Sequence, residues 1–434
     1  MLQKGDKKLI NAWAFYDWAN SVYSLVIGTT IFPIYYESIT KTDGGMVRFL
    51  GAEWHNTTIY TYSLGFSFLI VALLSPILSA IADYTGNKKR FMQFFCLLGS
   101  LSVMSLYFFT GKENVWIGLV FTILASVGFW GSIVFYNAYL PEVAEPKDQD
   151  RVSAKGFMLG YIGSILLLAF NLSMVMKPEI YGITDTTLPA RISFLMVGVW
   201  WLGFAQFTFS RLPNNPYKRK PEKDYIFKGY RELKKVFLEI KKHSQLRILL
   251  ISFFLYSIGV QTIILLASVF GIKDLGLETS NLITTILLIQ LVGIVGAFVF
   301  SRISRRIGNI KALKITILIW AFTCIGAYML NKDDPNVYLK FYALGGFIGF
   351  VLGAIQTLSR STYSKLITDE TKDHATYFSF FDVTEKIAIV VGMIIAGIVS
   401  SITDSLRLFI LILSVFFIAG FIVLSFMKKS KNVK

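Results

Sequence analysis

The sequence predicts an all-α integral membrane protein with twelve transmembrane helices, arranged as two six-helix halves. The 434 residues are 54% hydrophobic and only 16% charged, with a mean hydropathy of +0.58, whereas soluble domains average about 25% charged residues. The apolar residues occur in blocks of about 20, the length at which a helix crosses the hydrocarbon core of a bilayer. A basic segment divides these blocks into two sets of six, so we expect halves at 1–211 and 247–434 with a linker at 212–246.

The candidate spans follow one another along the whole chain. We place them at about 12–38, 58–82, 91–110, 115–139, 154–176, 190–210, 248–271, 280–300, 312–330, 337–359, 376–400 and 406–427. None shows the ten-residue alternation of a membrane β-barrel strand, so the sequence favours a helical bundle.

Lysine and arginine fix the expected orientation. Basic clusters such as 88–90 and 302–306 recur in every loop on the side of the two termini, while the opposite loops hold scattered single charges. The positive-inside rule therefore predicts that both termini are cytoplasmic, in what we expect to be a bacterial inner (plasma) membrane. The net charge of +16 is explained by this topology and gives no reason to expect a nucleic-acid partner.

The first span carries polar residues in an apolar helix. At helical spacing Asp17, Asn20 and three small residues (Ser21, Ser24 and Gly28) share one face. An ionised side chain inside a membrane helix costs on the order of 2.5 to 3.5 kcal/mol, so it needs a partner or water. We predict that this stripe lines an internal cavity. The alternative is an interfacial Asp17 that caps the helix.

Two loops in equivalent places resemble each other. Residues 79–88 follow the second span and 301–310 follow the eighth, and they share serine, isoleucine, glycine and asparagine at matching positions. Parallel six-span repeats are one of the known transporter architectures, so this match favours a duplicated transporter.

The first of these loops resembles the signature of the major facilitator superfamily, Gly-x-Leu-Ala-Asp-Arg-x-Gly-Arg-Lys. Here it is Ser-Ala-Ile-Ala-Asp83-Tyr-Thr-Gly86-Asn-Lys88. The resemblance implies the major facilitator fold, and a gating role for Asp83, Gly86 and Lys88 in a charge relay that holds the cytoplasmic side closed. Arg305 takes the acidic position in the second loop, so no such role carries over there.

A narrower resemblance covers most of the chain. Residues 16–23 (Tyr-Asp-Trp-Ala-Asn-Ser-Val-Tyr), 136–142, 153–163 and 356–361 are similar, in order, to motifs of the vacuolar amino-acid effluxer-like branch, named for an autophagy-related fungal protein. This resemblance implies amino-acid export. It also places Tyr23, Tyr136 and Asn137 in candidate substrate-binding motifs. In this fold spans 1, 4, 7 and 10 line the cavity, which favours Asn137 and Gln261, although any single amide can instead join helices.

The eleventh span holds three charges. Asp382, Glu385 and Lys386 project from one side of the helix, where Asp382 and Lys386 stack at i, i+4 while Glu385 and Lys386 diverge by about 100°. One acid is left over, and an acid that can take up a proton suits proton-coupled transport. The alternative is an ion network that only fixes helix packing. Arg360, at the end of the tenth span, could bind a substrate carboxylate or anchor to headgroups.

The linker predicts an amphipathic helix. Ile226, Tyr230, Leu233, Phe237 and Ile240 recur near helical period opposite a lysine-rich face. Such a helix is expected on the anionic cytoplasmic leaflet, which makes membrane lipids a partner. The alternative is a solvated linker.

The sequence predicts a transporter and no enzyme. Phosphate loops and nucleophile motifs are missing, both cysteines lie in apolar runs and the three histidines are scattered, so we expect no cofactor and no metal site. We predict a monomeric secondary transporter for a small polar solute, with amino acids first, coupled to protons through Asp17 or the three charges of the eleventh span. The rivals are the same fold exporting a lipid-like or drug-like amphiphile, a membrane enzyme, and a sensor or scaffold.

Overall fold

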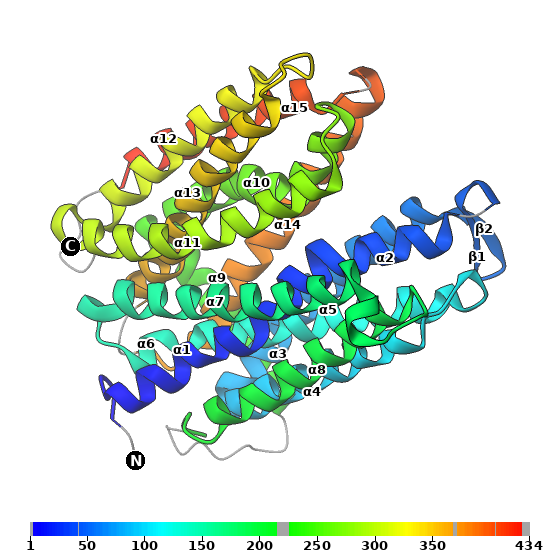
Figure 1. Ribbon diagram of the computed structural model, residues 1–434. Coiled ribbons are helices and arrows are strands. Elements are labelled where there is room, and N and C mark those ends of the chain that lie inside the picture. The colour runs from blue at the N-terminus through cyan, green and yellow to red at the C-terminus, as the bar shows by residue number, and fades with distance from the viewer. Residues whose placement is uncertain (1–2, 42, 215–224, 368–370, 404, 428–434) are drawn as a thin grey trace.

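The computed structural model describes residues 3–41, 43–214, 225–367, 371–403 and 405–427, which form a helical bundle with one small hairpin (Figure 1). The α-helices are α1 (Lys7–Val22), α2 (Ile31–Thr40), α3 (Asn56–Thr85), α4 (Lys88–Ser105), α5 (Val115–Ala138), α6 (Leu140–Val143), α7 (Gln149–Met176), α8 (Leu188–Phe209), α9 (Tyr225–Lys242), α10 (Ser244–Lys273), α11 (Thr279–Ile307), α12 (Asn309–Tyr328), α13 (Val337–Leu366), α14 (His374–Thr403) and α15 (Arg407–Ser425). The strands are β1 (Met46–Phe49) and β2 (Ala52–His55).

The long helices form two groups separated by α9. Helices α1–α8, here called the N-terminal half, pack among themselves, and so do α10–α15, the C-terminal half. The halves meet where α7 packs against α11 and α13, and where α3 and α5 pack against α14. Figure 1 shows the two groups converging at the end that holds α9 and diverging toward the end that holds the β1–β2 hairpin. We call these ends the linker end and the hairpin end.

The predicted spans agree with the long helices. Among the described residues, eleven helices are long and apolar enough to cross a membrane, and each corresponds to one of the spans expected from the second onward. The first expected span is divided into α1, a π-helical segment (Tyr23–Thr30) and α2, each shorter than a membrane crossing. The count of twelve crossings therefore stays a prediction, whereas the multi-pass helical membrane fold is confirmed.

A two-stranded antiparallel hairpin follows the first span. Met46 pairs with His55 and Phe49 with Ala52, so the turn is Leu50-Gly51, where both residues have positive φ. Asn56, the first residue of α3, is buried and donates to Glu37 and Thr40 at the end of α2. These bonds fix the hairpin end of the first span against α3. No sequence pattern predicted this hairpin.

Helix α9 lies against the bundle at the linker end. Gly229 faces Ile81 of α3, Val236 and Ile240 are buried, and Tyr377 of α14 donates a 2.6 Å bond to Glu239. The predicted amphipathic helix is therefore present, but part of its apolar surface contacts protein from both halves. Phe227, Tyr230 and Phe237 remain exposed and form a second apolar face, while the side chain of Ile226 lies outside the described ones.

Lys235 of α9 bridges toward α14. Its ammonium lies 3.4 Å from the carboxylate of Asp373 and 3.3 Å from that of Glu232. Partial burial disfavours the charge, but the two carboxylates prevail and raise the pKa of Lys235 above its usual value. The helix is thus held to the linker end by charge as well as by packing.

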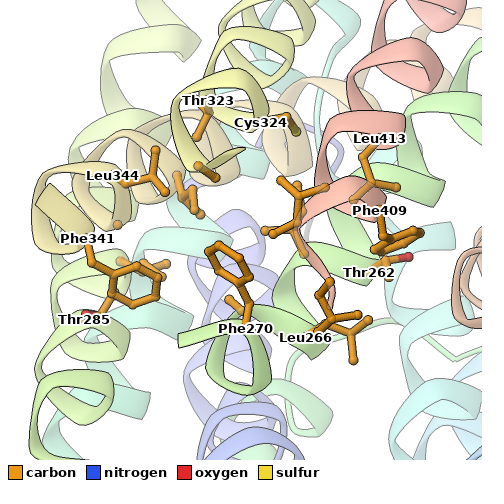
Figure 2. A pocket seen from close by; sticks show the side chains of 18 residues that line it. Thr262, Leu266, Phe270, Thr285, Thr323, Cys324, Phe341, Leu344, Phe409 and Leu413 are labelled. Carbon is orange, nitrogen blue, oxygen red and sulfur yellow. The ribbon is translucent and has the colours of Figure 1, made fainter. Parts of the chain in front are cut away.

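The C-terminal half encloses an apolar cavity of about 40 Å³ toward the hairpin end, between α10, α11, α12, α13 and α15 (Figure 2). Phe270, Phe341 and Phe409 lie around it. The threonines that border it, Thr262, Thr285 and Thr323, each donate to a carbonyl of their own helix. With their hydroxyls already bonded, they leave the cavity without free polar groups, and such cavities stay dry.

Candidate functional site

Asp17 of α1 is buried at the boundary between the two halves. Its Oδ2 accepts a 2.7 Å bond from the hydroxyl of Tyr136 on α5 and lies 3.4 Å from the guanidinium of Arg360 on α13. Gly156 of α7 packs so closely here that a side chain would meet this carboxylate. The interfacial alternative for Asp17 is wrong, because the side chain is 3% exposed and the helix cap is Asp6, which accepts from the Lys8 amide.

Arg360 reaches from the C-terminal half into the N-terminal half. Its Nε donates to the hydroxyl of Ser153 at 2.9 Å, its Nη2 to the Ser153 carbonyl at 2.8 Å and its Nη1 to Asn137 at 3.3 Å. The guanidinium also lies over the ring of Phe157 at 4.0 Å. We call Asp17, Tyr136, Asn137, Ser153 and Arg360 the Asp17–Arg360 cluster.

This arrangement corrects two expectations for Arg360. Helix α13 continues to Leu366, so Arg360 lies about 9 Å inside the helix, at 1.5 Å per residue. With 4% exposure it is no headgroup anchor. Its five donors are directed at protein acceptors in this conformation, so a role of Arg360 in binding a substrate carboxylate stays a prediction.

Three charges of α14 form a second cluster nearer the middle of the helix. The ammonium of Lys386 lies 3.0 Å from Asp382 Oδ1 and 3.1 Å from Glu385 Oε2, and Gln261 of α10 donates a 2.6 Å bond to Glu385 Oε1. The expected divergence of Glu385 and Lys386 did not hold, because the long lysine side chain reaches both acids. Two carboxylates still share one lysine.

The N-terminal half supplies an aromatic face to this cluster. The Lys386 ammonium lies 3.3 Å from the centre of the Trp130 ring on α5, a cation–π contact between the halves. Asp382 Oδ2 is buried and has no hydrogen-bond partner among the described residues. We call Trp130, Gln261, Asp382, Glu385 and Lys386 the α14 charge cluster.

The signature loop closes the linker end. Asp83 accepts from the backbone amides of Ala375 (3.2 Å) and Thr376 (2.7 Å) in the first turn of α14, and from the Thr376 hydroxyl at 2.8 Å. A carboxylate at a helix N-terminus is stabilised by the unpaired amides and the helix dipole. Gly86 ends α3 in the left-handed conformation, at φ 73°.

Lys88 holds this loop inside the N-terminal half. It is buried, forms an ion pair with Glu142 and lies 3.9 Å from Asp83. Asp83, Gly86 and Lys88 are therefore brought together with the first turn of α14, across the boundary between the halves.

A second cross-half contact at the linker end involves the second repeat loop. The acid is Asp150 of α7, in the N-terminal half. Its Oδ2 accepts from Lys365 at 2.9 Å and from Ser304 at 2.8 Å, and its Oδ1 accepts from Asn309 at 2.7 Å. Ser304 and Asn309 belong to the second repeat loop. That loop has no acid at the signature position, but it still joins the halves because its residues donate hydrogen bonds to an acid of the other half.

Two predicted residues do not join these clusters. Tyr23 packs against Phe129 and Trp201 inside the N-terminal half, with ring centres 4.9 and 5.8 Å apart. Asn20 is buried, and its amide nitrogen has no partner among the described residues.

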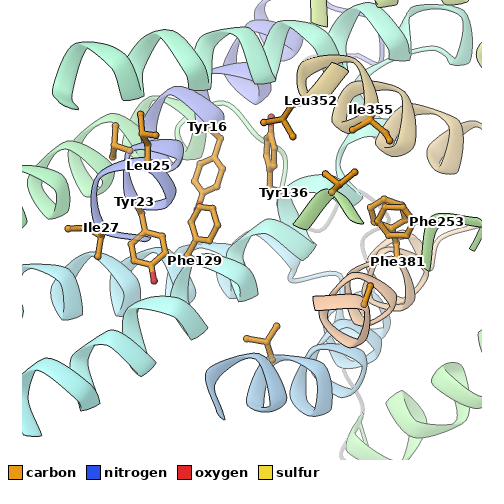
Figure 3. Close-up of a cluster of buried hydrophobic side chains, with 14 of the residues drawn as sticks. Tyr16, Tyr23, Leu25, Ile27, Phe129, Tyr136, Phe253, Leu352, Ile355 and Phe381 are labelled. Carbon is orange, nitrogen blue, oxygen red and sulfur yellow. The ribbon is translucent and has the colours of Figure 1, made fainter. Parts of the chain in front are cut away.

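Aromatic rings fill both halves around the interface: Tyr16 lies 5.2 Å from Tyr136, and Phe253 stacks on Phe381 at 3.9 Å (Figure 3).

The sequence reasoning missed several members of these contacts. Trp130 lies in an expected span, Ser153 begins an expected motif and Asp150 lies in the loop before the fifth span, but nothing in their spacing indicated a partner in the other half. Asn309 carried a usable signal, because it is one of the residues shared by the two repeat loops. The partner that it serves could not be inferred from that match.

The family described as "Vacuole effluxer Atg22 like" matches residues 5–434. The chain belongs to this family. It is 30% identical, over 99% of its own length and 97% of the relative's, to the "Uncharacterized MFS-type transporter YxiO" of Bacillus subtilis. It is 24% identical to "Autophagy-related protein 22" of Yarrowia lipolytica, covering 83% of this chain and 74% of the fungal one.

Solved transporter structures share the fold of this Atg22-like chain. The proton:xylose symporter XylE superposes with a TM-score of 0.72 over 98% of this chain and 96% of its own, at 12% identity. FucP in the outward conformation gives 0.68 over 98% of both chains, at 14% identity. These likenesses confirm the major facilitator fold. With the relatives, they identify the chain as a membrane transporter and not an enzyme.

Proposed function

We propose that this transporter moves a small polar organic solute, with amino acids first, by alternating access between its two halves. The observation that carries the proposal is the Asp17–Arg360 cluster, in which a buried arginine of one half is bound by three residues of the other, Asp17, Asn137 and Ser153. A contact of this kind ties two rigid bodies together in one conformation and must break in another.

The linker end is the closed end in this conformation. The Asp17–Arg360 cluster, the Asp83 contact with α14 and the Asp150–Lys365 pair all lie toward it. Because the basic loops predict the cytoplasmic side, we take the linker end to be cytoplasmic. This conformation is then closed to the cytoplasm. The family description names an effluxer, which supports export as the direction.

Proton coupling is proposed for the α14 charge cluster rather than for Asp17. Asp17 is matched by one arginine, whereas Asp382 and Glu385 share Lys386 and leave one negative charge. An unmatched charge is costly to bury, so a proton taken up there favours a closed, neutral site.

An amphiphile is the second candidate substrate. The apolar cavity of the C-terminal half favours it, since Asp17 does not line that cavity and phenylalanines do. The cavity lies inside one half, however, whereas alternating access needs a site that both halves share. The polar solute therefore comes first.

The test is a binding and transport screen of the whole chain. Thermal stability in detergent is measured against amino acids, peptides, nucleosides, lipids and hydrophobic cations; a ligand at 100 times its Kd should add about 2.7 kcal/mol of stability. Hits are then assayed in proteoliposomes with and without a pH gradient. Gradient-driven accumulation of a polar hit supports the proposal, and a response to lipids or hydrophobic cations alone would move it to the amphiphile.

A further inference from the structure

We propose that the α14 charge cluster recognises its substrate by a protonated amine, which binds Asp382 beside the face of Trp130 and takes the place of the coupling proton. This inference rests on the proposed function and narrows it. It assigns the substrate class, an ammonium-bearing solute, and it predicts exchange of that solute for a proton.

The first argument is the surrounding of the Lys386 ammonium. The ammonium of Lys386 already lies 3.3 Å from the centre of the Trp130 ring and 3.0 Å from Asp382. An aromatic face opposite a carboxylate is a surface that attracts organic cations. The lysine shows that an –NH₃⁺ group fits in this surrounding.

The second argument is a free acceptor. Asp382 is 4% exposed, yet its Oδ2 has no hydrogen-bond partner among the residues that the structure describes. A buried carboxylate oxygen without a donor is unfavourable, and an ammonium brings three donors. Glu385 is 18% exposed at its side chain, so this edge of the cluster is the more accessible one.

The third argument is charge. The ionisable groups around Asp382 are Glu385 and Lys386 on its own helix and, across from Glu385, Tyr256 of α10, which bonds to Ser359; α5 contributes the uncharged Trp130. With Tyr256 neutral, the sum is −1. One proton, or the ammonium of a solute whose carboxylate lies outside the cluster, brings the sum to zero, and both together would overcharge it. The two ligands therefore exclude each other.

The experiment compares three matched probes on the full chain in detergent. Valine and 3-methylbutylamine carry an amine that is protonated at both pH 6 and pH 8, and 3-methylbutanoate has the carbon skeleton of valine without it. The amines should stabilise the protein more at pH 8 than at pH 6, while 3-methylbutanoate should have no effect. Asp382→Asn should weaken amine binding about tenfold or more, the loss of one charge-assisted hydrogen bond.

Two further variants keep the result interpretable. Trp130→Leu removes the ring and leaves the charges, so it should weaken amine binding without abolishing the pH effect. Asp334→Asn changes a partly buried loop acid paired with Lys340, outside the cluster, and should bind like the parent. If Asp382→Asn is poorly folded by size exclusion, Trp130→Leu alone carries the test.

The outcomes separate this inference from the proposed function. Equal binding of 3-methylbutanoate, or transport of a polar solute without an amine, overturns the amine site but leaves a polar-solute transporter. Stabilisation by Na⁺ that is lost in Asp382→Asn also overturns it, because the free oxygen would then serve a metal cation. Absence of transport for every polar solute removes the proposed function itself.

Discussion

Replacing Arg360 by glutamine should open the linker end. The change leaves Asp17 buried without its cation, and breaking a buried pair costs about 3 to 5 kcal/mol. The lower value applies for two reasons. The Nη1 and Nη2 atoms of Arg360 lie 3.4 Å from Asp17, which is long for a charged pair, and Tyr136 still donates its 2.7 Å bond to Asp17. At 1.4 kcal/mol per factor of ten, a cost of about 3 kcal/mol shifts the population of the open state about 100-fold.

A cysteine at Thr357 can report the opening. Its side chain is fully buried between the halves, and its hydroxyl has no hydrogen-bond partner among the described residues, so a thiol there removes no bond. The rate of maleimide labelling in Thr357→Cys should rise about 100-fold when Arg360→Gln is added. The native cysteines, Cys96 and Cys324, are buried, and a chain without the reporter gives their background.

Two controls sharpen the comparison. Arg211→Gln removes another arginine of the linker end, whose guanidinium contacts Phe207 and Ser210 of its own half among the described residues, and it should leave labelling unchanged. Asp17→Asn combined with Arg360→Gln removes both charges and should recover part of the closure. If Arg360→Gln labels within threefold of the parent, the cluster does not hold the halves together and the reasoning is refuted.

Three further changes test neighbouring parts of the structure. Gly156→Ala places a methyl group against Asp17, 2.9 Å from the Tyr136 hydroxyl and 3.1 Å from Arg360 Nη2, so labelling at Thr357→Cys should rise; Gly203→Ala, which meets open space, should leave it unchanged. Asp83→Ala removes the acceptor of the first turn of α14 at a cost of about 1 to 2 kcal/mol, so labelling should rise about tenfold; an unchanged rate would mean that this contact does not gate. Ala327→Val partly fills the apolar cavity and should stabilise the chain by about 0.5 to 2 kcal/mol in thermal unfolding, whereas Ala354→Val, buried outside the cavity lining, should destabilise it.

The sequence was most informative where the physics is local. Apolar length located the eleven long apolar helices to within a few residues at most ends, because the hydrocarbon core sets that length. The i, i+4 spacing of Asp382 and Lys386 correctly indicated an ion pair, since it depends on one helix only. The cavity-lining role of Gln261 came from the resemblance and stays a prediction, although its amide does contact Glu385.

The contacts between the halves were beyond such reasoning. Asp17 and Arg360 are 343 residues apart and Asp150 and Lys365 are 215 apart, and their pairing depends on how the two halves pack. Each charge was visible in the sequence, but its partner was not. The docking of α9 was missed for a related reason: an amphipathic pattern shows that a helix has an apolar face, and cannot say whether lipid or protein covers it.

The π-helical segment between α1 and α2 gives the first span an unusual mechanical property. A π turn contains one residue more than an α turn, and each residue of an α-helix turns the chain by about 100°. The π-helical segment therefore sets the angle about the helix axis between residues on α1, such as Asp17, and residues on α2, such as Tyr36. If the segment became regular α-helix, α2 would rotate about the helix axis relative to α1, while the position of the axis would stay the same. Deleting a single residue from 23–30 should therefore do more harm to this span than many substitutions within it.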